Sequence, residues 1–82
     1  MQRGEQNLRA VAYSFADERD LNLSMNWTGT GLQIEFQEKP QPGKDRKFMR
    51  CTIAPLEVRV FDRDSRRLLL AQWDLAWKRG AA

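Results

Sequence analysis

Apolar and polar residues alternate along residues 21–37, and this pattern predicts a β-hairpin. Residues 21–27 alternate strictly, and residues 32–37 alternate again after a turn with the sequence Thr-Gly-Thr-Gly. Because side chains in a strand point to opposite faces with a period of two, each segment has one apolar face and one polar face. We expect a two-residue loop of type II′ at Gly29-Thr30, with the glycine at positive φ. The apolar pairs in this register are Trp27 with Leu32, Met25 with Ile34 and Leu23 with Phe36.

The same alternation over residues 56–61 predicts a second hairpin, with residues 67–75 as the return strand. Between these segments, Asp and Ser side chains can hydrogen-bond to local backbone groups, as they do in turns. A single register places apolar residues opposite apolar residues, which is what specifies a register. Its pairs are Val60 with Leu69, Val58 with Ala71 and Leu56 with Trp73. A helix that begins at Ser65 is the alternative for the return segment.

The rest of the chain adds one clear strand and one ambiguous segment. Residues 48–54 alternate and end at Pro55, which cannot donate to a strand ladder. Residues 8–15 fit a strand or an amphipathic helix. The fold class that we predict is mainly β, a small antiparallel barrel or sandwich of five to six strands. The alternative is an α+β fold with residues 8–18 as a helix packed on the sheet.

The chain length indicates one domain. We expect residues 1–7 to form a disordered lead, residues 8–77 a single β domain and residues 78–82 a frayed tail. The polar stretch 38–47 contains two prolines and a glycine, which favour an extended loop. With 82 residues the core is small, and both Trp27 and Trp73 are expected to be buried in it.

The composition excludes several classes of function. The chain has no histidine and one cysteine, Cys51, so neither a Cys/His zinc site nor a nucleophile activated by histidine can be built. We therefore expect no enzyme activity, no metal and no cofactor. No apolar run reaches the length of a membrane span, and the N-terminus lacks the apolar region of a signal peptide. A single cysteine fits a reducing compartment, so the predicted location is cytoplasmic, without a membrane partner.

Charge is distributed unevenly along the chain. Residues 1–38 contain three basic and six acidic residues, and residues 39–82 contain eleven basic and five acidic residues. The basic excess is densest in two segments that we predict to be loops, where binding residues are often found. These candidate binding residues are Lys44, Arg46 and Lys47 in the first loop, and Arg63, Arg66 and Arg67 in the second.

A candidate apolar patch lies on the second face of the hairpin at 56–75. It consists of Phe61, Leu68 and Leu70, and large apolar patches are rarely left without a use. Either the N-terminal segment or another chain would cover it. We therefore expect a non-catalytic interaction module that binds a protein or nucleoprotein partner through the basic loops and the patch, by assembly or occlusion. A sequence-tolerant small β-barrel that binds nucleic acid is the alternative, and a homo-oligomer is a further arrangement.

Overall fold

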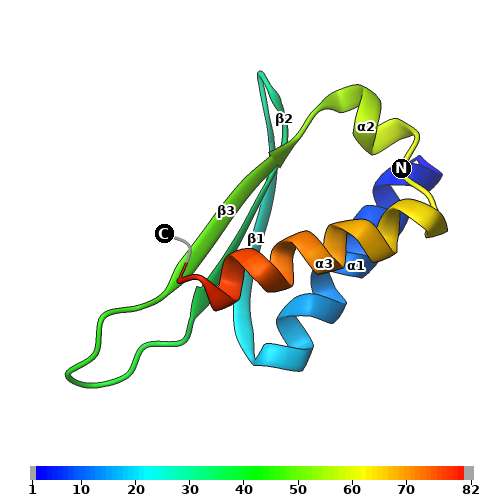
Figure 1. The fold of residues 1–82 in the computed structure, drawn as a ribbon. Helices are drawn as coiled ribbons and strands as arrows, with labels where there is room; N and C mark the ends of the chain where they lie inside the picture. Colours follow the sequence, from blue (N-terminus) through cyan, green and yellow to red (C-terminus); the bar gives the residue numbers. More distant parts are fainter. Residues whose placement is uncertain (1, 81–82) are drawn as a thin grey trace.

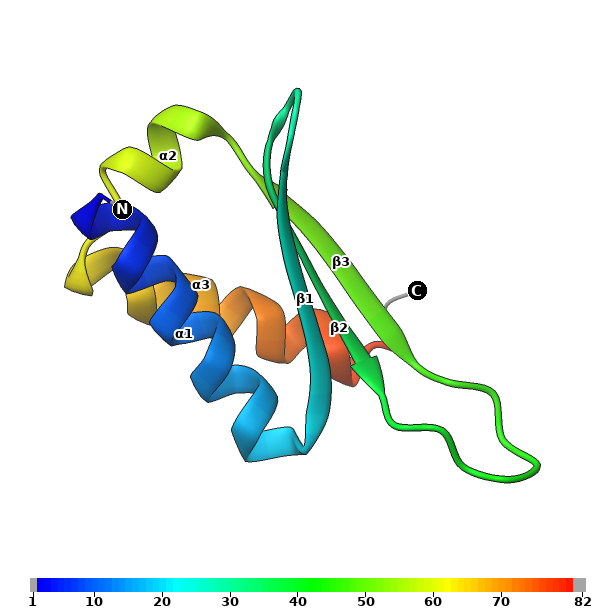
Figure 2. The ribbon, with the colours of Figure 1, turned by 180° about the vertical axis from the view of Figure 1, so that it is seen from behind.

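One sheet and three helices make up the protein, in a computed structural model that describes residues 2–80. The sheet is antiparallel, with the strand order β1-β2-β3, and the helices lie on one side of it (Figure 1). Seen from behind, α1 passes in front of α3, and the two long helices contact each other on the same side of the sheet (Figure 2). The elements are α1 (Arg3–Arg19), β1 (Leu21–Thr28), β2 (Gly31–Glu38), β3 (Phe48–Ile53), α2 (Pro55–Arg59) and α3 (Arg63–Lys78).

The prediction of a five- to six-stranded barrel or sandwich is wrong. The described residues form three strands in an open sheet, and three helices. The α+β alternative is the one that fits, with α1 packed on the sheet and longer than the 8–18 segment that we expected. Residues 3–7, expected in a disordered lead, form the start of α1, and the expectations for residues 1, 81 and 82 lie outside the described residues. No helix among residues 2–80 combines the length and apolarity needed to cross a bilayer.

The hairpin of residues 21–37 is confirmed in its register. Trp27 pairs with Leu32, Met25 with Ile34 and Leu23 with Phe36. The type II′ turn is wrong, because the positive φ lies at Gly31 (145°) and not at Gly29. A Cβ at Gly31 would sit 2.2 Å from the carbonyl oxygen of Ile53, so glycine lets β2 approach the end of β3.

The second hairpin is wrong, because residues 55–59 and 63–78 are helical. Pro55 stands at the start of α2, where its missing N–H costs nothing. Asp62, expected in a turn between strands, caps α3 by accepting a hydrogen bond of 2.9 Å from the backbone N–H of Ser65. The helix that we kept as an alternative for this segment is therefore present, but Asp62 caps it in place of Ser65.

An aromatic trio joins three elements in the core. Phe15 of α1, Phe36 of β2 and Trp73 of α3 have ring centroids 4.7 to 5.6 Å apart, with both Trp73 contacts edge-to-face. All three side chains are buried. The expected burial of Trp73 is confirmed, whereas Trp27 is 46% exposed, so its predicted burial is wrong. The helix α1 contributes the apolar stripe Leu8, Val11, Ala12 and Phe15.

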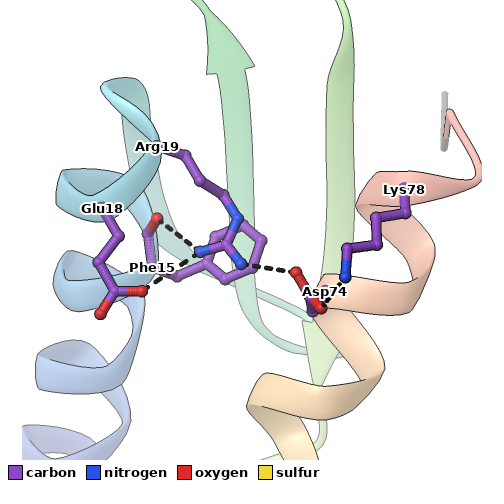
Figure 3. Close-up of polar contacts among 5 residues, drawn as sticks. All are labelled: Phe15, Glu18, Arg19, Asp74 and Lys78. Atoms are coloured by element: carbon purple, nitrogen blue, oxygen red, sulfur yellow. Dashed lines mark hydrogen bonds and ion pairs between the residues drawn. The ribbon is translucent and has the colours of Figure 1, made fainter.

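A polar clamp joins the C-terminal parts of α1 and α3 beside Phe15 (Figure 3). The guanidinium of Arg19 lies 3.9 Å from the ring centroid of Phe15 and donates to Asp74 at 2.7 Å. Asp74 also pairs with Lys78 at 2.9 Å. These hydrogen bonds, first from Lys78 and then from Arg19, hold the pKa of Asp74 below its usual value. The clamp joins α1 to α3, and Trp73, buried in the core, marks the side of α3 that faces inward.

Candidate interaction surface

A groove opens between α2, α3 and the end of β3. Its volume is about 210 Å³, and we call it the α2–α3 groove. Its lining includes Phe61, which is buried, and Val60 and Leu68, which are 62% and 70% exposed. The apolar lining is Ile53, Val60, Phe61, Leu68 and Leu69. Its polar lining is Glu57, Ser65 and Gln72. A site of this size accepts one or two apolar side chains.

Exposed apolar side chains continue beyond the groove on the same two helices. Leu56 of α2 is 64% exposed, and Leu75 of α3 is 52% exposed. Trp73 is the only residue of α3 that is fully buried, although the helix carries four leucines and two tryptophans. The part of α3 that faces away from the sheet is therefore more apolar than the outer face of a helix that contacts only water.

The predicted apolar patch is only partly present. Leu68 is on the surface as expected, but Leu70 is half-buried and Phe61 is 8% exposed. The three residues were expected to share a strand face, and the helical conformation separates them. Leu56, Val60 and Leu75 were missed as surface residues, because the strand register placed Leu56 and Val60 on the core face. The signal that was available is the spacing of seven residues between Leu68 and Leu75, which aligns them on one side of a helix.

The two predicted basic groups do not come together. Lys44, Arg46 and Lys47 lie in the connection that leads into β3, while Arg63, Arg66 and Arg67 lie in the first two turns of α3. Lys47 places its ammonium 4.6 Å from the ring centroid of Trp77, near the other end of α3. From Arg63 to Trp77 the helix rises by roughly 21 Å. Both views show the 39–47 loop and the start of α3 at opposite ends of the molecule (Figures 1 and 2).

The contact of Lys47 with Trp77 gives the first basic group two further members. Lys78 and Arg79 follow Trp77 directly and are exposed. We call this set the loop-end cluster: Lys44, Arg46, Lys47, Lys78 and Arg79. Lys78 and Arg79 were expected in a frayed tail, so they were not among the binding residues that we predicted from the sequence. The second set, Arg63, Arg66 and Arg67, is fully exposed and stands beside the carboxylates of Asp62 and Asp64.

Among residues 2–80, three titratable groups have a clearly shifted pKa: Cys51, Asp62 and Asp74. Burial raises the pKa of the Cys51 thiol, and a hydrogen bond with Trp73 offsets this in part. A thiol with a raised pKa is protonated near neutral pH and is a poor nucleophile. Hydrogen bonds from the backbone N–H and side chain of Ser65 lower the pKa of Asp62, which fits its capping role. In the same range, no three acidic or sulfur side chains gather as metal ligands would.

We compared the chain with models of protein families, with curated proteins and with solved structures. None of the three comparisons gave a match.

Proposed function

We propose that the protein is a non-catalytic interaction module that binds another protein chain through the outer surface of α2 and α3. The observation that carries this proposal is the set of four large apolar side chains, each at least half exposed, on these adjacent helices: Leu56, Val60, Leu68 and Leu75.

The groove adds a place for an anchor residue. Desolvated apolar side chains that enter a pocket contribute most of the binding energy in protein interfaces. The α2–α3 groove is open, lined mainly by apolar side chains and bordered by Val60 and Leu68. An apolar side chain of the partner that enters it removes these two side chains from water.

The basic groups at the two ends of α3 would act on the rate of association. Arg63, Arg66 and Arg67 and the loop-end cluster flank the apolar surface along the helix axis. Exposed charges of this kind steer encounter and contribute little to affinity, because water and salt screen them.

Site-specific photo-crosslinking tests the proposal. A photoreactive residue in place of Leu68 is expected to give a discrete protein–protein crosslink in the cells that make the protein. The matched control is the same residue in place of Asn26, which is exposed on the polar face of β1. The crosslink from position 68 should disappear when Leu75→Glu is added. An identical set of products from positions 68 and 26 would contradict the proposal.

Nucleic-acid binding is the second candidate, and the loop-end cluster favours it. Lys44, Arg46, Lys47 and Arg79 make no ion pair with any residue of the described part of the chain, and Trp77 is half-buried beneath Lys47. Unpaired cations beside an aromatic ring are the parts from which single-strand binding sites are made. Electrophoretic mobility shifts with single-stranded and duplex DNA and RNA at two salt concentrations test it. No shift at low salt would exclude this candidate.

A further inference from the structure

The outer side of α3 carries a stripe whose order of residues is complementary to itself. Asp64, Leu68, Leu75 and Arg79 are separated by four, seven and four residues, so they lie along one side of the helix. All four are exposed. Between the leucines, Ala71 and Gln72 are exposed on the same side. We call these six residues the α3 stripe.

Along the helix, the α3 stripe consists of an acidic residue, a leucine, a centre of one small and one polar residue, a second leucine and a basic residue. A second copy that lies antiparallel presents the same order in reverse. In the register centred between Ala71 and Gln72, Leu68 therefore faces Leu75 of the second copy, and Asp64 faces Arg79. The contacts repeat by symmetry, as an isologous two-fold interface requires.

We propose that the occupant of this surface is a second copy of the chain, with the two α3 helices antiparallel about a two-fold axis at Ala71 and Gln72. This inference rests on the proposed function and names its partner. Ala71 is small, so the helices can approach to the ordinary interaxial distance of about 8–10 Å. In Figure 1, α3 lies in front, with no other element between it and the viewer.

The α2–α3 groove completes the contact. Its lining includes Leu68 and Val60, which are both exposed. Because Leu75 of the second copy faces Leu68, it is placed at the groove and removes Val60 and Leu68 from water. The pairing of Asp64 with Arg79 contributes mainly to register, because exposed ion pairs are weak. An interface made by α3 and the edge of α2 would bury a small accessible surface, below about 1,200 Å² in total. We therefore expect a dimer that dissociates on dilution.

Sedimentation of the full chain over a wide concentration series tests the proposal. The mass should rise from one chain to two with concentration. Leu68→Glu should hold it at one chain. Tyr13→Glu is the matched control, since Tyr13 is a large exposed side chain on α1, 56% accessible, and its replacement should leave the dimer unchanged. A parent that stays at one chain, or a dimer that tolerates Leu68→Glu, would overturn the proposal.

A charge exchange separates this register from every other dimer. In the proposed dimer, position 64 of each copy faces position 79 of the other. Asp64→Arg alone places two arginines together there, and Arg79→Asp alone places two aspartates together, so each variant should dimerise less than the parent. An equimolar mixture of the two variants restores an opposite charge in every pair and should recover dimer as a heterodimer. Failure of the mixture to exceed both single variants, each with parental helix content by circular dichroism, would overturn the antiparallel register.

The outcomes also separate this inference from the proposed function. A chain that is monomeric at all concentrations, yet crosslinks from position 68 to a different protein, refutes the second copy as partner and leaves the interaction module in place. A monomer with no crosslink specific to position 68 refutes both.

Discussion

Two tryptophans of this small domain have different environments, and their replacement should show it. Trp73 is 3% exposed and makes edge-to-face contacts with Phe15 and Phe36. Trp73→Ala leaves a cavity at the junction of α1, β2 and α3, and such changes cost about 3–5 kcal/mol. We therefore expect a large fall in the free energy of unfolding, measured in urea.

Trp27→Ala is the matched control for that measurement. Nearly half of the Trp27 side chain is already in water, so its loss should be much less costly. Equal losses of stability for the two variants would contradict the assignment of Trp73 to the core and of Trp27 to its margin.

Gly4 is required by a close approach of backbones. A Cβ at this position would lie 2.1 Å from the carbonyl oxygen of Val58, where α1 crosses α2. In Gly4→Ala, the better helix propensity of alanine contributes about 1 kcal/mol. Overpacking against a backbone atom costs about 1–3 kcal/mol. We expect a net loss, seen as a lower melting temperature.

Gly29→Ala provides the comparison, because no atom lies within 4 Å of a Cβ at that position and its φ is not in the positive range. Its melting temperature should stay close to that of the parent. A Gly4→Ala variant as stable as Gly29→Ala would mean that α1 and α2 can separate at little cost.

Residue-level features such as these are only partly accessible from the sequence. The alternation of residues 21–37 determined the face of each side chain, and it correctly paired Leu23 with Phe36. It could not tell that Trp27 lies at the margin of the core, in a pocket beside the start of α1 and α2, where it stays 46% exposed. Periodicity reports which face a side chain is on, and burial also depends on what covers that face.

At the scale of the elements, residues 55–78 show why periodicity can mislead. Their apolar residues are so numerous that both a period of two and a helical spacing find partners. Leu69, Trp73 and Trp77 recur at intervals of four and face the core, as in a helix. The deciding signal was local. Asp62 precedes a run of good helix formers and accepts from the backbone at Ser65.

The cap at Asp62 makes a prediction about pH. Hydrogen bonds from Ser65 lower the pKa of Asp62 in the folded state below its ordinary value of 3.8, so the ionised form stabilises α3. This stability is present above the unfolded pKa and is lost as the pH falls through the folded pKa. Asp62→Asn retains a capping oxygen but does not titrate.

The free energy of unfolding of the parent and of Asp62→Asn should therefore be compared from neutral pH to about pH 2, below the usual pKa of an aspartate. The parent should lose more stability on acidification than the variant, because all other carboxylates are shared. Parallel pH profiles would show that Asp62 does not cap α3 through its charged form.

At the scale of the whole molecule, the arrangement of the helices determines what each charge can do. The sequence predicted that both basic groups lie in loops of one small β domain. In the structure α3 separates Arg63, Arg66 and Arg67 from the loop-end cluster. Which segments meet across a fold depends on long-range packing, and a single sequence with two competing periods does not specify it.

This separation predicts that the two basic groups act independently toward a polyanion. One variant carries Lys44, Arg46 and Lys47 changed to Glu, a second carries Arg63, Arg66 and Arg67 changed to Glu, and a third combines them. Because either group alone still binds a short oligonucleotide, each triple change should weaken binding only slightly, and the combined variant should lose much more binding free energy than the sum of the two losses. The combined variant should also show the weakest dependence of binding on salt, since the fewest counterions are released.

The measurement is a titration of a short single-stranded oligonucleotide at two salt concentrations, followed by fluorescence anisotropy. An oligonucleotide too short to span the roughly 21 Å along α3 contacts one group at a time. Losses that simply add would mean that the two groups contact the oligonucleotide together as a single site, which would contradict their separation along α3. A parent that does not bind at low salt would leave the apolar surface of α2 and α3 as the functional part of the molecule, with its basic ends serving only to guide a protein partner.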